Sequence, residues 1–268
     1  MDAAAAYRVQ ARNLSHASEN KIHDDDVARR FGFEGGLVPG VEVYAYMSHL
    51  PAARWGPEWL ERGSAECRFF KPVYDGRFAI VSATETARAL SITVESEGER
   101  CATGAAALPV EPSAAPVIPE AAAVPASDER PIADEGTLAI GRRLSSHPVQ
   151  YTHERLRLYL AAIGEAEPLY AREQVLHPAL MLRLSNLALK DNVKLGAWIH
   201  AGSSIRHYAL AHAGESLAAH AMVAANYERK GHRFVELDVV IVANGTRAVA
   251  QVRHTAIYRL AVHPSEEP

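Results

Sequence analysis

A proline- and alanine-rich stretch divides this chain into two parts of similar size. It runs from Pro109 to Gly136 (PVEPSAAPVIPEAAAVPASDERPIADEG) and has no sustained hydrophobic period. Proline lacks a backbone N–H and fixes φ, so we expect neither a regular helix nor a central strand there. Such a composition is typical of a semi-extended connector. We therefore predict two modules, residues 1–108 and 141–268, joined by a linker over residues 109–140.

Both modules show the same order of elements. In each, an apolar helix comes before four strand-like runs separated by turn signals. The expected helices are 24–30 and 35–50 in the first module and 153–163 and 179–189 in the second. The expected strands are 7–14, 65–70, 77–86, 89–96 and 100–108, and then 203–211, 216–228, 233–242 and 247–262.

The start of each central helix carries a related motif, Leu37-Val38-Pro39-Gly40 in the first module and Leu176-His177-Pro178-Ala179 in the second. This similarity indicates an internal duplication. Long antiparallel strands wrapped around one apolar helix would bury that helix on all sides, which explains apolar residues on several of its faces. The predicted fold class is α+β, with two tandem modules, each an antiparallel sheet wrapped around a central helix.

Composition excludes several classes of function. The chain has 28 Lys and Arg against 32 Asp and Glu, a net charge of −4, which argues against electrostatic capture of nucleic acid. No apolar run approaches the roughly 20 residues that span a bilayer, and the N-terminus has no signal-peptide pattern, so we expect a cytoplasmic protein without a membrane partner. The two cysteines, Cys67 and Cys101, lie far apart and suggest neither a disulfide nor a zinc site. We expect no metal and no cofactor.

One segment carries a more specific signal. The run from Asn20 to Phe33 (NKIHDDDVARRFGF) resembles the signature of the MaoC-like, (R)-specific enoyl-thioester hydratase family. That signature is Asp-x-Asn-Pro-(Leu/Ile)-His-x-Asp, then an Ala, then Gly-Phe, then a loop that ends in His-Gly before the central helix. The positions that agree in register are Asn20, Ile22, His23, Asp25, Ala28, Gly32, Phe33 and Gly40. The resemblance implies a tandem double hot-dog protein that acts on acyl thioesters.

The resemblance also implies site residues. Hydration of a 2-enoyl thioester needs a base to activate water, a proton path to C2 and donors for the thioester oxygen. By resemblance, His23 is the acid/base. Gly40 and its neighbour Val41 supply backbone amides, which are unpaired at a helix N-terminus. Asn20 and Asp25 complete the expected substrate-binding set.

The chain departs from the family pattern at two important positions. Ser18 replaces the family's catalytic Asp. Because its hydroxyl is a far weaker base than a carboxylate, a catalytic Ser18 would need a second group to activate it. Pro39 replaces the family's His. Glu42 could restore a His–carboxylate pair with His23, or could simply be favourable charge in the first turn of a helix. In the second module, Glu165 and Tyr170 fall on the Asp and His positions of the motif.

We therefore predict a hydratase or dehydratase-like lyase with an altered active site. The substrate would be an acyl thioester of CoA or of an acyl-carrier protein, and the protein could form a homodimer. Two alternatives stay open. One is a hot-dog thioesterase that uses Glu42, and the other is a non-catalytic subunit that binds an acyl group or a partner protein.

Overall fold

The computed structural model describes residues 6–16 and 18–261 of the chain. The first module contains β1 (Ala6–Gln10), the 3-10 helix η1 (Lys21–His23), α1 (Asp25–Arg30), α2 (Gly40–Trp55), α3 (Pro57–Arg62), β2 (Ser64–Phe69), β3 (Phe78–Thr86), β4 (Ala89–Ser96) and β5 (Glu99–Ala107). The second contains β6 (Arg143–Ser145), β7 (Val149–Gln150), α4 (His153–Ile163), α5 (Leu169–Glu173), α6 (Ala179–Lys190), β8 (Ile199–His207), β9 (Ser216–Arg229), β10 (His232–Ala243) and β11 (Arg247–Arg259). Val262, the expected end of the last strand, lies outside the described residues.

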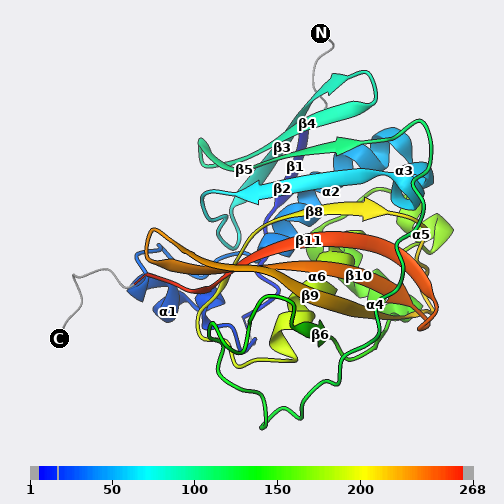
Figure 1. Cartoon of the computed structure of the whole chain (residues 1–268). Coiled ribbons are helices and arrows are strands. Elements are labelled where there is room, and N and C mark those ends of the chain that lie inside the picture. Colours follow the sequence, from blue (N-terminus) through cyan, green and yellow to red (C-terminus); the bar gives the residue numbers. More distant parts are fainter. Residues whose placement is uncertain (1–5, 17, 262–268) are drawn as a thin grey trace.

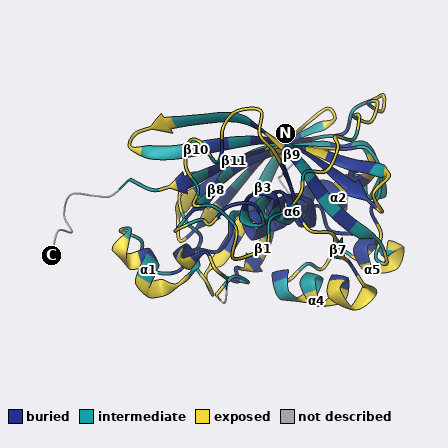
Figure 2. Cartoon of the chain, turned by 60° about the horizontal axis from the view of Figure 1, so that its bottom comes forward, coloured by how far each residue is buried: buried dark blue, intermediate teal, exposed yellow. Residues whose placement is uncertain are grey.

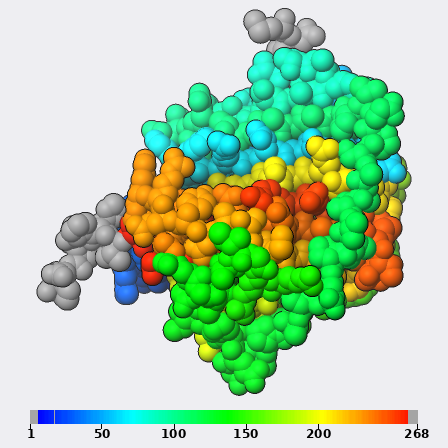
Figure 3. Space-filling model, viewed as in Figure 1, coloured from blue at the N-terminus to red at the C-terminus, as the bar shows by residue number. Residues whose placement is uncertain are grey.

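The strands of both modules join into one 11-stranded antiparallel sheet (Figure 1). Its order is β1-β3-β4-β5-β2-β8-β11-β10-β9-β6, and β7 also pairs with β9. The modules meet where β2 pairs with β8, from Ser64 opposite Arg206 to Arg68 opposite Gly202. In the space-filling view the cyan, yellow and red-orange strands form adjacent bands across one face (Figure 3). The two modules therefore lie side by side in a continuous sheet.

The two central helices, α2 and α6, lie together under the sheet, and α4 and α5 lie further out with exposed faces (Figure 2). Every residue of α2 from Val41 to Ser48 is buried, including Glu42. This burial confirms the expected apolar helix enclosed by its sheet. The helix begins at Gly40 rather than at Gly35 because Pro39 precedes it with extended dihedral angles and Leu37 forms a β-bridge with Tyr74.

Turn residues set the register of the hairpins. Glu97-Gly98 joins β4 to β5, and Lys230-Gly231 joins β9 to β10, in both cases with positive φ at both residues. Two-residue turns of this kind match the twist of the strands that they connect. The sequence patterns missed α3, α5, β6 and β7, which are short elements, and β8 begins four residues before its expected start.

The proline-rich stretch has neither a helix nor a named strand between Leu108 and Arg142, all of which the structure describes. It crosses the outer face of the second module (Figure 3). The amide of Ala122 donates to Ser145 Oγ (2.9 Å), and the carbonyl oxygen of Pro119 lies 2.8 Å from His220 Nδ1. Ile118 packs against a small cluster of Val240, Val242 and Ala248. The stretch is thus held against the sheet over residues 118–122.

Among the described residues, no helix combines the length and apolar character needed to cross a lipid bilayer.

Candidate active site between the two modules

A cavity of about 360 Å³ lies between the modules. The first module contributes η1, the loop before it and the start of α2, and the second contributes α4, α6 and the segment before β8. We call it the cationic cavity because its lining includes Arg155, Arg183 and Lys190. The other lining residues are Ser15, Ser18, Asn20, His23, Pro39, Gly40, Val41, Val149, Tyr151, Tyr159, Leu180, Asn186, Leu187, Trp198 and His200. Of the site residues predicted in the first module, all except Glu42 and Asp25 line it.

His23 is held in a defined orientation at the edge of this cavity. Its Nδ1 lies 2.7 Å from the carbonyl oxygen of Leu37. A carbonyl only accepts hydrogen bonds, so Nδ1 carries the proton and Nε2 of the neutral ring is an acceptor. Asn20 Nδ2 lies 3.2 Å from Nε2 and donates to it. Burial lowers the pKa of His23 to about 4, although the Leu37 carbonyl opposes the shift.

Asn20 links the loop that carries His23 in the first module to the second module. Its side chain donates to the carbonyl of Trp198 (2.9 Å) and accepts from the amide of Trp198 (3.2 Å). It also caps η1 by accepting from Ile22 N. Because both ends of its amide group are fixed by Trp198, the N–H that reaches His23 has a defined direction. Asn20 therefore positions His23 across the module boundary.

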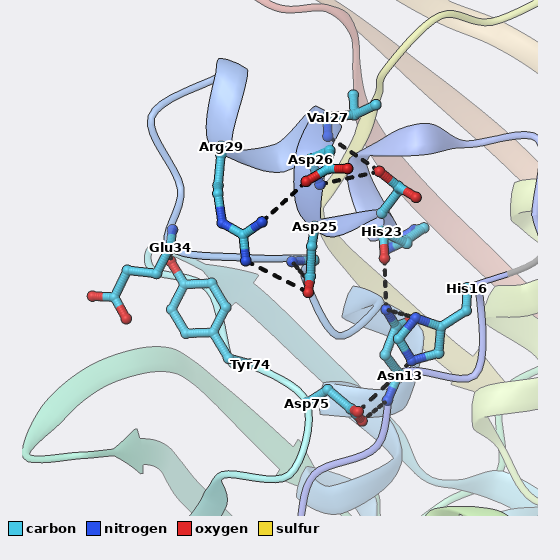
Figure 4. Close-up of polar contacts among 12 residues, drawn as sticks. Asn13, His16, His23, Asp25, Asp26, Val27, Arg29, Glu34, Tyr74 and Asp75 are labelled. Atoms are coloured by element: carbon cyan, nitrogen blue, oxygen red, sulfur yellow. Dashed lines mark hydrogen bonds and ion pairs between the residues drawn. The ribbon is translucent and has the colours of Figure 1, made fainter.

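A clamp on the following loop fixes the Leu37 carbonyl. Asp25 Oδ1 accepts from the amide of Gly36 (2.7 Å), and the amide of Leu37 donates to Ile22 O. A Cβ on Gly36 would lie 2.3 Å from the carbonyl oxygen of His23, so only glycine fits this close approach. Figure 4 shows Asp25 and Asn13 around the histidine loop. Asp25 thus acts on His23 through the loop, not by contact with the cavity.

The start of α2 supplies donors to the same cavity. Pro39 precedes the helix and provides no side-chain cap. Among the described residues, no acceptor pairs with the amides of Gly40 and Val41, and the positive end of the helix dipole lies there. A Cβ on Gly40 would lie 2.9 Å from Phe69 and 3.0 Å from His200, so the site packs tightly around it. These two amides are free to donate hydrogen bonds to a ligand in the cavity.

Ser18 also borders the cavity, but its hydroxyl donates to the carbonyl of Asn20 at 3.2 Å. No hydrogen bond joins it to His23 in the part of the chain that the structure describes. In this structure, Ser18 therefore does not act as the partner of His23 that the family's Asp would be.

Glu42 does not form the expected pair with His23. Its carboxylate is fully buried and accepts hydrogen bonds from Nε (2.9 Å) and Nη2 of Arg183. Burial raises the pKa of Glu42, and Arg183 opposes that shift. In turn Glu42 and Tyr159 raise the pKa of Arg183 against the effect of burial. The ion pair joins the central helices of the two modules, which a pattern within one helix could not reveal.

Sequence reasoning missed the residues that the second module contributes to the cavity. Arg183 interrupts the otherwise apolar run ALMLRLS of α6, and this interruption was the one available signal. Tyr159 and Asn186 also line the cavity, and the Tyr159 hydroxyl and Asn186 Oδ1 are buried without a partner in the described structure. The lining thus includes polar side chains whose hydrogen bonds the described structure does not complete.

A second, mostly apolar cavity of about 280 Å³ shares the lining residues His23, Gly40, Trp198 and His200 with the cationic cavity. We call it the apolar cavity. Its further lining residues include Ile22, Phe33, Leu37, Val38, Val43, Phe69, Val73, Ile199, Ile257 and Leu260. His23 and the start of α2 therefore stand between two open spaces, one charged and one apolar.

Glu165 and Tyr170, the motif positions of the second module, lie away from both cavities. Glu165 is buried, with His49 Nδ1 at 2.7 Å and His177 Nε2 at 3.5 Å. Burial acts to raise the pKa of Glu165, but the nearby His177 and the hydrogen-bonded His49 outweigh it and lower that pKa, while burial lowers the pKa of His177. The ring of Tyr170 is tilted by 38° against that of His177, with the ring centres 4.8 Å apart, and Tyr170 is also buried. The group borders neither cavity and joins the two modules; a catalytic role for Glu165 and Tyr170 stays a prediction.

Within the described residues, no group of three or more His, Cys, Asp or Glu side chains is placed to hold a metal ion. The buried histidines of the second module form a different arrangement, in which Ser203 Oγ lies between His200 Nε2 (2.8 Å) and His254 Nδ1 (3.0 Å). Burial lowers the pKa of His200 to about 3, so the ring is neutral. This arrangement forms the wall behind Gly40.

Comparison with known proteins gives structural relatives. No family model matches the sequence, and no curated protein matches it. A MaoC domain protein from Chloroflexus aurantiacus superposes with a TM-score of 0.61 at 11% identity, covering 97% of both chains. A conserved hypothetical protein from Mycobacterium tuberculosis with a double hot-dog fold has a TM-score of 0.61 at 16% identity over 96% of both chains.

A MaoC-like dehydratase has a TM-score of 0.59 at 13% identity and again covers 96% of both chains. At these identities the likeness shows the fold, and it extends over the whole of each molecule. It confirms the α+β tandem arrangement expected from the internal repeat and from the residues around His23. The chain is a double hot-dog protein with the fold of the MaoC-like dehydratases.

Proposed function

We propose that this protein is an acyl-thioester hydratase or dehydratase-like lyase whose site lies at the meeting point of the two cavities. The observation that carries the proposal is the arrangement of His23 and α2. A histidine fixed in one tautomer by Leu37 and the free amides of Gly40 and Val41 border the same cavity. A base and an oxyanion site facing one space are what enoyl-thioester hydration requires.

The reaction follows from these positions. The thioester oxygen accepts hydrogen bonds from the amides of Gly40 and Val41, which draws electron density from the C2=C3 bond. Water attacks C3 as His23 Nε2 takes one of its protons, and the thioester becomes enolate-like. The imidazolium then returns that proton to C2, and the sum is addition of one water. The Leu37 carbonyl stabilises the imidazolium through Nδ1, and dehydration is the reverse path.

The same geometry favours a slow enzyme. A histidine whose pKa is lowered to about 4 is a weak base toward water. A water at Nε2 must also compete with the N–H of Asn20, 3.2 Å away. No carboxylate contacts either ring nitrogen of His23 among the described residues. We therefore expect a lower turnover than that of a site with a complete Asp–His dyad.

The contacts support this lyase over a thioesterase that uses Glu42. The Glu42 carboxylate is wholly buried, pairs with Arg183 and lines neither cavity. A base or nucleophile must reach the substrate. A non-catalytic acyl-binding subunit predicts binding of the thioester without turnover, which the experiment below separates.

The test is loss of the enoyl absorbance of 2-enoyl-CoA thioesters, with a thiol reagent present to report free CoA. We expect hydration by the native protein and its loss in His23→Ala. His147→Ala is the matched control, because His147 is an exposed histidine that borders neither cavity. Release of thiol that stops in Glu42→Gln would identify a thioesterase. Tight binding of thioesters without either reaction would identify an acyl-binding subunit.

A further inference from the structure

The lining of the cationic cavity has an uneven charge. Arg155 and Lys190 come from α4 and from the end of α6, and Arg183 comes from the middle of α6. The lining contains no Asp and no Glu. Arg155 and Lys190, together with the part of Arg183 that Glu42 leaves unpaired, give this space a positive lining without an acidic residue, which attracts an anionic ligand.

Arg183 is held so that part of its guanidinium stays available. Glu42 accepts from Nε and Nη2, and no acceptor among the described residues pairs with Nη1. Glu42 lies behind Arg183, wholly buried, while a third of the Arg183 side chain is exposed. The carboxylate of Glu42 therefore fixes the guanidinium from the protein side and leaves its other edge toward the cavity.

A second observation points to the same place. The hydroxyl of Tyr159 is buried, its polar neighbour is the Arg183 guanidinium, which can only donate, and no acceptor in the described structure pairs with its O–H. Tyr159 lines the cavity, and the Arg183 guanidinium carbon lies 5.5 Å from the centre of its ring. Buried polar atoms in native proteins are nearly always paired, so an unpaired hydroxyl at a cavity indicates a missing partner. Tyr159 O–H and Arg183 N–H are both donors, and one carboxylate accepts from both.

We propose that the acyl group of the substrate lies in the cationic cavity and ends in a carboxylate, which Arg183 and Tyr159 bind. The proposal rests on the function proposed above and adds the substrate class, a thioester of a short dicarboxylic acid. His23 and Arg183 border the same cavity, and the charge of Arg183 is one of the influences that lower the pKa of His23. Since one cavity of about 360 Å³ would hold both the reacting carbons and the carboxylate, the acyl chain between them is short.

A carboxylate is favoured over an alkyl end in this cavity because an alkyl end would leave polar groups without hydrogen bonds. A plain alkyl chain packed on Arg183 and Tyr159 would displace water from a guanidinium and a hydroxyl without replacing its hydrogen bonds. A plain alkyl chain suits the apolar cavity instead. The phosphates of CoA are a second source of the same anionic chemistry, and the experiment separates the two sources through the carrier.

The experiment measures the affinity of the native protein for glutaryl and valeryl thioesters by calorimetry. These acyl groups have the same number of carbons and differ in the terminal carboxylate. Each is offered on CoA and on N-acetylcysteamine, which has no phosphate. We expect the glutaryl thioester to bind about tenfold more tightly or better on both carriers, as one charge-assisted hydrogen-bonded contact provides.

Variants assign the preference to its residues. Glu42→Gln/Arg183→Gln removes both charges of the buried pair together, and we expect it to lose the preference for glutaryl. Arg183→Lys keeps the charge without the planar fork, and we expect an intermediate preference. Arg157→Gln is the matched control, an exposed arginine of α4 outside the cavity. Should a variant fail to fold, the preference of the native protein still decides the proposal.

Equal affinity for glutaryl and valeryl thioesters would overturn the proposal. A loss of affinity in the double variant that appears with CoA thioesters and not with N-acetylcysteamine thioesters would also overturn it, and would assign Arg183 to phosphate. Hydration of a neutral enoyl-CoA without preference for an acidic one would leave the proposed lyase standing and refute the substrate class. Selective binding of the glutaryl thioester without hydration of the matching enoyl diacid thioester would support the carboxylate site and refute the proposed lyase.

Discussion

The buried pair of Glu42 and Arg183 offers a direct test of how the two modules are held together. The change is Arg183→Gln, which leaves the Glu42 carboxylate fully buried without its cation. Removing one member of a buried ion pair typically lowers the free energy of unfolding by about 3–5 kcal/mol. Since a third of the Arg183 side chain is exposed, water can partly replace the lost charge, and we expect the lower end, about 3 kcal/mol.

The assay is urea unfolding followed by tryptophan fluorescence, because Trp55 ends α2, Trp59 lies in α3, and Trp198 lies at the module boundary. The double variant Glu42→Gln/Arg183→Gln keeps hydrogen-bonding groups in place without either charge. We expect its free energy of unfolding to lie within about 1 kcal/mol of the native value, since removing both charges removes the unpaired one. The comparison isolates the charge from the loss of side-chain volume.

The dependence on pH has a definite sign. Burial raises the pKa of Glu42 even in the native protein, and loss of Arg183 removes an opposing influence. In Arg183→Gln the folded protein therefore keeps a proton on Glu42 that the unfolded chain releases above its ordinary pKa. Stability then falls as pH rises. We expect a small deficit near pH 5 and the full deficit near pH 8. A loss under about 1 kcal/mol, or equal deficits at both pH values, would refute the reasoning.

Three further predictions concern the loop that carries His23. Burial lowers the pKa of His23 to about 4, so its neutral, basic form persists well below the ordinary histidine pKa. The value of kcat/KM for an enoyl thioester should therefore stay level from pH 8 to near pH 5.5. A fall centred near pH 6.5 would contradict this prediction. Asp25→Ala removes the acceptor for the Gly36 amide and should lower kcat about tenfold. Asp25→Asn keeps an acceptor and should retain most of the activity. Steady-state rates of the two variants check this, and equal rates would argue against the clamp. Gly36→Ala places a Cβ 2.3 Å from the His23 carbonyl and should lower the free energy of unfolding by about 2 kcal/mol; an unchanged urea midpoint would show that the loop adapts freely.

Local patterns in the sequence were sufficient where an element is defined by its own residues. The apolar run after Pro39 predicted a helix enclosed on all sides, and residues 41–48 are all buried. The turn pairs Glu97-Gly98 and Lys230-Gly231 placed the hairpins correctly. Short elements such as α5 and β7 were missed because they have too few residues to show a hydrophobic period.

The candidate site was only partly readable in the same way. His23, Asn20 and Gly40 were found because they lie on one short motif, and all three border the cationic cavity. The partner proposed for His23 was Glu42, but the structure pairs Glu42 with Arg183. A pairing between side chains 141 positions apart depends on how α2 and α6 meet, and no local spacing encodes it.

The sequence by itself determined the duplicated α+β order, the enclosed central helices and the histidine loop, because hydrophobic periodicity and turn chemistry act over a few residues. Tertiary structure alone decided what stands opposite that loop. Pairing of β2 with β8 brings the second module's Arg183 and Tyr159 to the cavity that His23 borders, and it buries Glu42 behind them. The charge of a cavity is a property of all the segments that surround it. Only the folded arrangement of both modules therefore sets which ligand it can accept.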